Sequence, residues 1–488
     1  MSLALQPALR RPRSRGRSIL ARAGVALLLC NAGCITTTPR PVEPHAVHAA
    51  WLTLDARGAT QAVRGALPSD DPVRPGFDLE NGISLEEAVA TALFFNPELS
   101  TLRARTRIEL AALRHAGAWS DPELAVDGEQ ILASVPDRLL WSGTIGVTIP
   151  LSGRPEGARN LAAPRLDAGG AAGLGAEGAV GAELRRLWLE LATEDARSRL
   201  LDGAIGDLES LVAARDQLRA ARALSVLEER LLLLELARAQ EQRIETRARR
   251  SELRLRVLAH LGLHPAHPWE LRPSFPALDR NHDREHGLSE FESLREHPDL
   301  AIALAAYEVA ERTLALEKHR AVPDLTIGLG GGREDDQSRL AFGLGLLPIP
   351  VWNRNEAGIE TARESRAASR TEVESEIRRL VGRRAVEHER YHAALERLRH
   401  LEDVVAPLAD AQIEDARRLA ALGSLDPLIL VEAVEEQRRV RLEVLAARSA
   451  ALAAQLSLEA LTAPCEAHAP SISPRSAESP PESERESP

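Results

Sequence analysis

Two stretches of the sequence carry nearly the same phrase, GVTIPLSGRPEGA at residues 146–158 and GLLPIPVWNRNEAG at residues 345–358. Each places an Ile-Pro pair and then an arginine between an alternating apolar run and a polar run that resembles a helix in composition. Proline has no N–H to donate to a strand ladder, so a strand should end there. We therefore predict two junctions at which a strand is followed directly by a helix, the first marked by Pro150 and Arg154 and the second by Pro350 and Arg354.

The two phrases belong to a longer internal repeat. NPEL at 96–99 returns as HPDL at 297–300, and DPEL at 121–124 returns as VPDL at 322–325. Several matches in the same order, each about 200 residues apart, indicate a tandem duplication. We expect the first repeat over residues 81–263, the second over residues 291–463, and a connecting segment over residues 264–290.

Both repeats have the same predicted elements. A helix begins at Pro97 or Pro298, where proline fits the first turn, and ends near residue 117 or 320. Runs with a period of two, such as 141–149, 325–330 and 340–346, predict strands with one apolar and one polar face. Long helices over 155–222 and 355–422 then lead into returning helices over 228–261 and 428–461. We expect Pro164 and the glycines of 169–181 to weaken the first long helix, and Pro407 to kink or break the second.

The N-terminal region is typical of a secretory signal. Residues 1–33 contain six arginines, no acidic residue and a short apolar run over 23–29. Ala32 and Gly33 precede Cys34, an arrangement that resembles the cleavage box of a bacterial lipoprotein, in which the cysteine is lipidated. Residues 34–80 contain several prolines and predict an irregular linker. Residues 464–488 are rich in Pro, Ser and Glu and predict a disordered tail.

Composition and motifs argue against several classes of function. The net charge of −11 disfavours a nucleic-acid partner, and three cysteines cannot form a disulfide framework. GLGGGR at 328–333 lacks the Lys-Ser/Thr ending of a nucleotide loop, and no nucleophile motif is present. Histidines come closest to metal-ligand spacing at His264 with His267 and at His282 with His286, both in the connecting segment. We therefore predict no enzymatic activity, no cofactor and no metal site.

The predicted strands require more than one chain. Each run is about ten residues long, enough for a tilted membrane strand. Four strands cannot close a barrel, and an open sheet edge is not tolerated in lipid, so closure needs several copies. The alternative is a soluble helical bundle with two hairpins, which repeated amphipathic strands behind a secretory signal make less favoured.

The same phrases resemble those of a known family. NPEL, LRHAGAWSDPEL and IPLSGR, repeated as REHPDL, AVPDL and IPVWNRNEAG, resemble the TolC-type outer-membrane efflux proteins, and LPIPVWNRNEAG looks most like their CzcC-like heavy-metal branch. The resemblance covers residues 83–463 and implies a mainly helical fold with a long helical hairpin barrel. It also implies four strands per chain, at 123–131, 140–149, 324–332 and 339–348, in a shared barrel of twelve strands. A homotrimer in the outer membrane of a Gram-negative bacterium, with a large periplasmic portion, would follow.

The resemblance also implies partners and functional residues. Such a channel docks through a periplasmic adaptor protein onto an inner-membrane pump of the RND type. The helical turns that match the adaptor-docking tips contain Ala223, Leu224, Ser225 and Val226 in the first repeat, and Leu422, Gly423, Ser424 and Leu425 in the second. Ala223 stands where the motif usually has glycine, the residue that best tolerates positive φ. Candidate gate carboxylates near these tips are Glu228, Glu229, Asp426 and Glu432, each of which could instead lie on a solvated helix face.

Three functions fit these observations. The leading hypothesis is a passive exit duct of a three-part efflux system. Heavy-metal cations are its candidate substrates. The second is the outer-membrane duct of a type I protein secretion system. The third, from another class, is a non-conducting structural lipoprotein that spans the periplasm.

Overall fold

The computed structural model describes residues 39–131, 138–213, 225–280, 294, 296–334, 337–344, 352–421 and 427–462. The chain divides into two units, Met1–Thr53 and Leu54–Pro488. Helix α2 (Pro44–Leu52) is the only element described in the first unit, and none of its residues is buried. The signal segment, Cys34 and the predicted tail over 464–488 lie outside the described residues.

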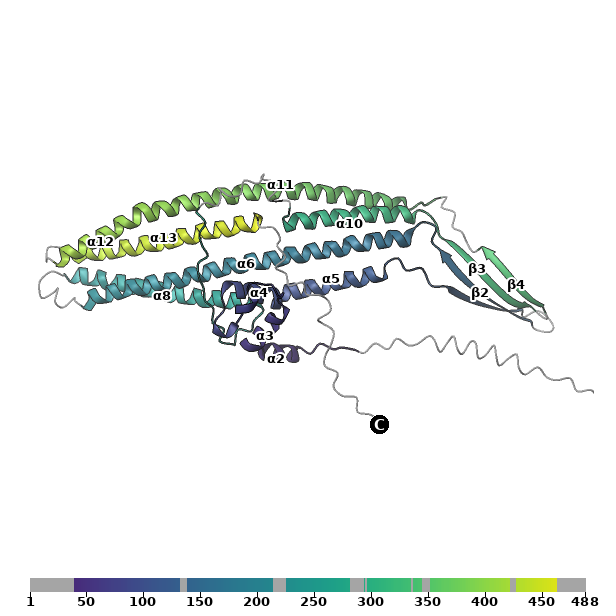
Figure 1. The fold of residues 1–488 in the computed structure, drawn as a ribbon, viewed down its shortest axis with the longest axis horizontal. Helices are drawn as coiled ribbons and strands as arrows, with labels where there is room; N and C mark the ends of the chain where they lie inside the picture. The colour runs from purple at the N-terminus through teal and green to yellow at the C-terminus, as the bar shows by residue number, and fades with distance from the viewer. Residues whose placement is uncertain are drawn as a thin grey trace, which may run out of the picture. The chain divides into compact units, whose positions relative to one another are not determined.

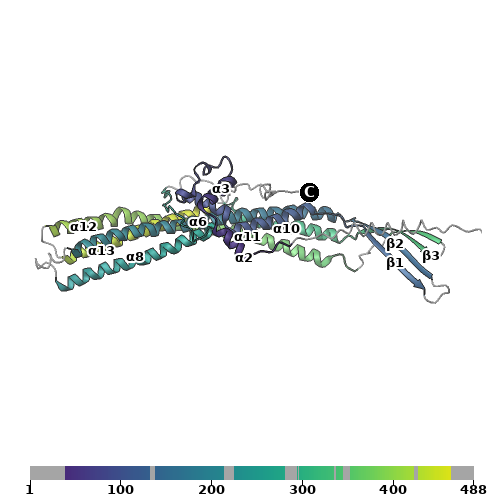
Figure 2. The same cartoon turned by 90° about the horizontal axis from the view of Figure 1, so that it is seen from below.

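The second unit contains a four-stranded antiparallel sheet in the order β1-β2-β3-β4 (Figures 1 and 2). Its strands are β1 (Glu123–Ile131), β2 (Arg138–Ile149), β3 (Leu325–Glu334) and β4 (Gln337–Leu344). The register places Leu124 opposite Ile145, Ile145 opposite Leu329, and Leu329 opposite Phe342. All four predicted strands are therefore present, although residues 345–348 of the last one lie outside the described residues.

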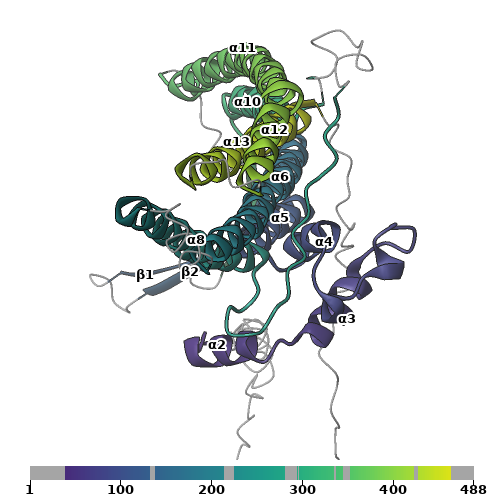
Figure 3. The ribbon, with the colours of Figure 1, turned by 90° about the vertical axis from the view of Figure 1, so that its left-hand side faces the viewer.

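Long helices form the rest of this unit. The first half of the chain contributes α4 (Leu85–Phe95), α5 (Pro97–His115), α6 (Arg154–Ala213) and α8 (Val226–Leu261). The second half contributes α10 (Pro298–Arg320), α11 (Glu356–His400), α12 (Ala406–Ala421) and α13 (Pro427–Thr462). Near the sheet, α6 packs between α5 and α10, and toward its other end it packs against α8 and α13 (Figures 1 and 3).

Helix α13 contains a stretch, Ile429–Leu461, that is long and apolar enough to cross a membrane by length and composition. In the structure this helix packs against α6, α11 and α12. Ala447, Ala451 and Leu452 on α13 are almost fully buried. Packing between helices therefore accounts for the apolar residues of α13 that are buried.

Helices α5 and α10, at corresponding positions of the two predicted repeats, begin with the same kind of cap. The Asn96 Oδ1 atom accepts hydrogen bonds from the N–H groups of Glu98 and Leu99, at 2.9 and 3.2 Å. At the corresponding position, His297 Nδ1 accepts a hydrogen bond from the N–H of Asp299 at 3.1 Å. Burial lowers the pKa of His297, which favours the neutral ring that can act as this acceptor. The Asn-Pro and His-Pro motifs therefore cap the N-termini of α5 and α10.

The expected weakening of the first long helix does not interrupt it, because α6 continues through Pro164 to Ala213. Two of its glycines, Gly157 and Gly175, lie where α10 approaches closely. A β-carbon at Gly175 would lie 2.9 Å from Ile302 Cδ1, and one at Gly157 would lie 3.2 Å from Leu316 Cδ1. Glycine costs about 1 kcal/mol of helix propensity at each site. Close packing of the helices outweighs that cost here, which propensity alone could not predict.

At Pro407, where a kink or a break was expected, the structure has a π-helical turn, η4 (Leu401–Val405), just before the proline. The N–H of Ala406 donates to the carbonyl of Leu401, five residues earlier. Pro407 has no N–H for the carbonyl of Asp403, and its ring would clash with that carbonyl in a regular α-helix. The wider turn just before the proline lets the helical path continue into α12.

The segment 34–80, expected to be irregular, also contains helix α3 (Ala56–Ala66) and two short 3₁₀ turns, Arg74–Gly76 and Leu79–Asn81. Asp55 caps α3 by accepting a hydrogen bond from the N–H of Gly58 at 2.8 Å. Ala59 and Val63, four residues apart on one face, are buried in the same core as Leu184 of α6. This apolar pair is the signal for a helix that the proline content of the segment concealed.

Glycine at position 262 should be essential for how α8 ends. Gly262 has a φ of 75°, and a β-carbon there would lie 2.3 Å from the carbonyl oxygen of Phe95. We predict that Gly262→Ala lowers the free energy of unfolding by about 1–3 kcal/mol, measured by thermal or denaturant unfolding in detergent. Gly178→Ala is the matched control, because nothing lies within 4 Å of a β-carbon at this position in α6. It should raise stability by about 0.4–1 kcal/mol, and equal effects of the two substitutions would contradict this account.

Candidate functional site

The sheet presents one apolar face to the surroundings. Residues that face each other across the strands share a face, so Leu124, Ile145 and Leu329 form one row on this side. Large side chains on this face are strongly exposed: Leu124, Val126, Ile145, Val147, Leu329 and Leu340. A contiguous exposed apolar surface of this kind marks a contact with lipid or with another chain. We name these six residues the apolar face.

The opposite face is polar and rich in glycine. Glu123, Ala125 and Asp127 of β1 lie across from Gly146, Thr144 and Ser142 of β2. These β2 residues lie in turn across from Gly328, Gly330 and Gly332 of β3. A β-carbon at Gly330 would lie 2.8 Å from the Thr144 hydroxyl oxygen, so glycine lets that hydroxyl lie over β3. The sheet therefore separates an apolar surface from a polar one that carries acidic groups.

An ion pair marks the first strand-to-helix junction. Arg154, the first residue of α6, pairs with Asp324, the residue just before β3. The Asp324 side chain is only 14% exposed, so most of this carboxylate is shielded from water. Pro150 directly follows the last ladder pair, Ile149 with Leu325. The predicted junction residues of the first repeat therefore lie where the strand ends, and Arg154 connects the two repeats.

Backbone geometry between β2 and α6 also depends on the second repeat. Gly153 has a φ of 70°, which only glycine adopts without strain. His319 of α10 donates a hydrogen bond from Nδ1 to the carbonyl of Ser152. The turn that contains Gly153 is thus held against α10.

At the second junction, the structure reveals a residue that the sequence interpretation missed. Arg354 is exposed and lies just before α11, whereas Pro350 lies outside the described residues. Asn355 has a φ of 60°, the left-handed conformation that asparagine tolerates better than most residues. Its side-chain amide donates to the carbonyl of Glu317 at 2.9 Å and to Glu317 Oε2 at 2.7 Å. Asn355 therefore fixes the start of α11 against α10, and the Asn-rich phrase WNRN was the available signal.

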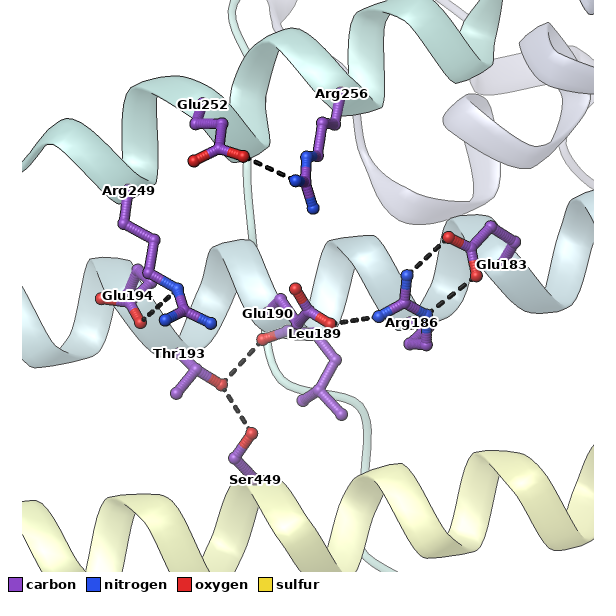
Figure 4. Close-up of polar contacts among 10 residues, drawn as sticks. All are labelled: Glu183, Arg186, Leu189, Glu190, Thr193, Glu194, Arg249, Glu252, Arg256 and Ser449. Atoms are coloured by element: carbon purple, nitrogen blue, oxygen red, sulfur yellow. Dashed lines mark hydrogen bonds and ion pairs between the residues drawn. The ribbon is translucent and has the colours of Figure 1, made fainter. Parts of the chain in front are cut away.

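A polar layer lies between α6, α8 and α13 (Figure 4). The Thr193 hydroxyl donates to the carbonyl of Leu189 at 2.8 Å and lies 2.9 Å from the Ser449 hydroxyl of α13. Glu194 of α6 is buried and lies 3.4 Å from Arg249 of α8. Burial raises the pKa of Glu194, although the nearby Arg197 and Arg249 oppose that shift.

Only part of the predicted docking tips lies among the described residues. Ala223, Leu224, Leu422, Gly423, Ser424, Leu425 and the candidate gate residue Asp426 fall outside them. Ser225 is the N-cap of α8, and its hydroxyl accepts from the N–H of Glu228 at 3.3 Å. The Glu228 carboxylate accepts in return from the N–H of Ser225, which lowers the pKa of Glu228. Glu228 therefore has a capping role, whether or not it also faces a gate.

The other described tip residues are exposed to different degrees. Val226 and Leu227 at the start of α8 are 54% and 68% exposed, which is unusual for apolar side chains. Glu229 is partly exposed on the same helix, and Glu432 is exposed on α13. Exposure alone does not test a gate role, so the assignment of Glu229 and Glu432 to the gate stays a prediction.

Within the described part of the chain, no group of three or more His, Cys, Asp or Glu residues is placed to hold a metal ion. The rings of His264 and His267 lie 6.3 Å apart between centroids. His264 Nδ1 accepts a hydrogen bond from the N–H of Ala266 at 3.1 Å. His282 and His286 lie outside the described residues.

Residues 292–463 match the family model described as outer membrane efflux protein. This stretch includes β3, β4 and the helices from α10 to α13. The second half of the chain is therefore similar to the outer membrane efflux proteins, which agrees with the family predicted from the repeated phrases. The CzcC-like branch stays a prediction. A comparison with curated proteins gives no match.

Solved outer-membrane channels share the fold. CusC, solved in a study of its folding and transmembrane channel formation, aligns with a TM-score of 0.65 at 14% identity over 77% of this chain and 91% of its own. VceC from Vibrio cholerae aligns with a TM-score of 0.64 at 17% identity over 78% of this chain and 96% of its own. The outer-membrane channel OprN aligns with a TM-score of 0.68 at 16% identity over 88% and 99%. At these identities the likeness concerns the fold alone.

The raised pKa of Glu194 predicts a pH-dependent stability. Between the ordinary carboxyl pKa and the raised folded value, the folded state binds more protons than the unfolded state, so stability falls as pH rises through this range. Glu194→Gln cannot ionise, so we predict a higher melting temperature than wild type at pH 8 and a flatter dependence above pH 5.

Glu183, on the same helix, is the control with the opposite sign. A hydrogen bond from Arg186 lowers the pKa of Glu183, so its contribution is present at neutral pH and is lost as pH falls through the lowered value. Glu183→Gln should therefore lower the melting temperature at pH 8 and have less effect at pH 3. A lower melting temperature for Glu194→Gln at pH 8 would contradict the assigned cause.

Proposed function

We propose that this protein is the outer-membrane exit duct of an efflux system, passively conducting substrate from the periplasmic side to the outside. The observation that carries the proposal is the two-faced sheet. Its apolar face suits lipid, its polar face suits an aqueous lumen, and its strands lead directly into long helices. The match of residues 292–463 to the outer membrane efflux protein model and the shared fold of outer-membrane channels support the same function.

The duct is formed by a homotrimer, and the sheet geometry supports an oligomer. In the described strands, β1 and β4 each pair on one side only. Backbone groups at an open edge cannot be left unpaired in lipid, so neighbouring copies must cover both edges. Three copies give twelve strands, the number that the family resemblance implies. The apolar face then contacts the lipid of the outer membrane, and the helices extend into the periplasm.

The helical ends away from the sheet dock a periplasmic adaptor, which connects the duct to an inner-membrane pump of the RND type. The exposed Val226 beside the Ser225 cap supports this placement, because a docking surface needs accessible apolar groups. Cys34 carries a lipid anchor in this proposal. Incorporation of a fatty-acid analogue, lost in Cys34→Ser, tests the anchor.

Heavy-metal cations are the proposed substrates. The polar face offers a carboxylate at Asp127, and three copies would place three such negative charges around a narrow lumen. A deletion strain should become more sensitive to heavy-metal salts than its parent. Unchanged metal tolerance together with loss of protein export would instead favour a type I secretion duct.

Conductance of the purified protein in planar bilayers tests the proposed duct. We expect discrete single-channel currents that favour cations. Because a closed helical end could silence the channel, the measurement is repeated with the tips opened by substitution of Glu229 and Glu432. No current in either form would overturn the duct and favour a non-conducting structural lipoprotein.

Asp127 should contribute to ion selectivity if the polar face lines the lumen. We predict that Asp127→Lys shifts the reversal potential in asymmetric KCl toward that of chloride, because three charges change sign inside the pore. Glu86→Lys is the control, since Glu86 is an exposed acid on α4, away from the sheet. Equal shifts for the two variants would contradict the assignment of the faces.

A further inference from the structure

The two repeats do not have equivalent surroundings within one chain. Helix α10 packs against both α6 and α11, whereas its repeat counterpart α5 packs, among the described long helices, against α6. In the sheet, β2 and β3 each have two neighbours, while β1 and β4 each have one. The first repeat thus lacks a neighbour on one side, and the second lacks one on the opposite side.

Burial shows the same difference between counterparts. Val434 of α13 is 5% exposed, because it packs in a cluster with Ile205 and Leu208 of α6. Its counterpart in the first repeat is Leu234 of α8, which is 46% exposed. Leu227 and Leu231, on the same side of α8 by helical spacing, are also exposed. A large side chain that is buried in one repeat is therefore uncovered in the other.

The second repeat has the complementary uncovered surface. Val404 in η4 and Leu408 and Leu419 on α12 are 45%, 67% and 44% exposed. In the first repeat, α6 is the counterpart of α11 and α12. Within one chain, α13 of the second repeat packs against α6 and covers its surface. Because α8 is the counterpart of α13, α8 of a second copy would cover α12 in the same way. The apolar surfaces on α8 and α12 therefore fit each other in a contact between copies.

A charged pair identifies the contact at the level of residues. Arg154 follows β2 and pairs with Asp324, which directly precedes the neighbouring strand β3. In the internal repeat, Arg354 corresponds to Arg154, and Glu123 corresponds to Asp324. Glu123 begins the edge strand β1, and Arg354 lies just before α11 of the second repeat. Both charge signs are thus retained at positions that one chain cannot bring together.

We infer that Arg354 of one copy binds Glu123 of the next copy, and that this ion pair repeats the Arg154–Asp324 pair across the subunit interface. The first repeat of each copy then packs on the second repeat of its neighbour, with α5 against α11 and α8 against α12. Such a head-to-tail contact forms a closed ring when its rotation closes. The inference rests on the proposed trimeric duct and specifies which residues join its subunits.

Crosslinking tests the pairing, with a control that the chain itself offers. Glu123→Cys/Arg354→Cys and Arg154→Cys/Asp324→Cys are made on a Cys465→Ser background and treated with a short bismaleimide in the membrane. The first variant should give covalent dimers and trimers on a denaturing gel. The second should give an internally linked monomer. Reaction of the second variant with no oligomer from the first would overturn the inference, and single-cysteine variants give the background.

Charge reversal provides an independent readout. Glu123→Arg or Arg354→Glu alone should weaken the trimer about fivefold per interface, and the double reversal should restore it. The trimer fraction is measured by native mass spectrometry in mild detergent. A double reversal no better than either single one would overturn the pairing. Wild-type trimers that conduct ions would still support the proposed duct, so failure of the pairing and failure of the duct are distinguishable.

Discussion

Satisfying the backbone hydrogen bonds of a four-stranded sheet is the constraint on which the rest of this structure depends. Within one chain the sheet has two open edges, at β1 and β4. One face of the same sheet exposes large apolar side chains, so water is an unsuitable environment for it. Lipid would suit that face, but lipid does not tolerate open strand edges. Only copies that cover each other's edges meet both requirements, which is why the proposed function needs an oligomer.

The contacts at the strand-to-helix junctions transmit this geometry to the helices. Arg154 joins the start of α6 to the residue before β3, and Asn355 joins the start of α11 to α10. Glycines at positions 157 and 175 allow α10 to pack closely on α6. Helix α6 is therefore held by the second hairpin as well as by its own, and α11 is held by α10. The placement of the strands and the placement of the helices cannot change independently.

Local signals in the sequence predicted much of this architecture. Alternating polarity identified the strands, and prolines after capping residues identified the starts of α5 and α10. The uninterrupted course of α6 through Pro164 was not predictable, because it depends on packing against α10, which lies far away in the sequence. Helix α3 was missed because its signal is two small apolar residues in a proline-rich segment.

In the candidate site, too, local sequence signals predicted some residues but not the contacts that depend on tertiary structure. Pro150 and Arg154 lie at the predicted junction, but the partner of Arg154, Asp324, follows from tertiary structure and not from any local pattern. Asn355 was missed because its role depends on a contact with Glu317. Glu228, predicted as a gate residue, also has a capping role that its spacing from Ser225 already indicated. The remaining tip residues lie largely outside the described residues and stay predictions.

Alternate exposure along β2 is the most direct test of a membrane sheet around an aqueous lumen. Single cysteines replace Thr144 and Thr148 on the polar face and Ile145 and Val147 on the apolar face, and are treated with a charged maleimide in native outer membranes. We predict that the first two react and that the second two are protected until the protein is denatured. Equal reactivity of all four cysteines, or protection of the threonine positions alone, would contradict the account.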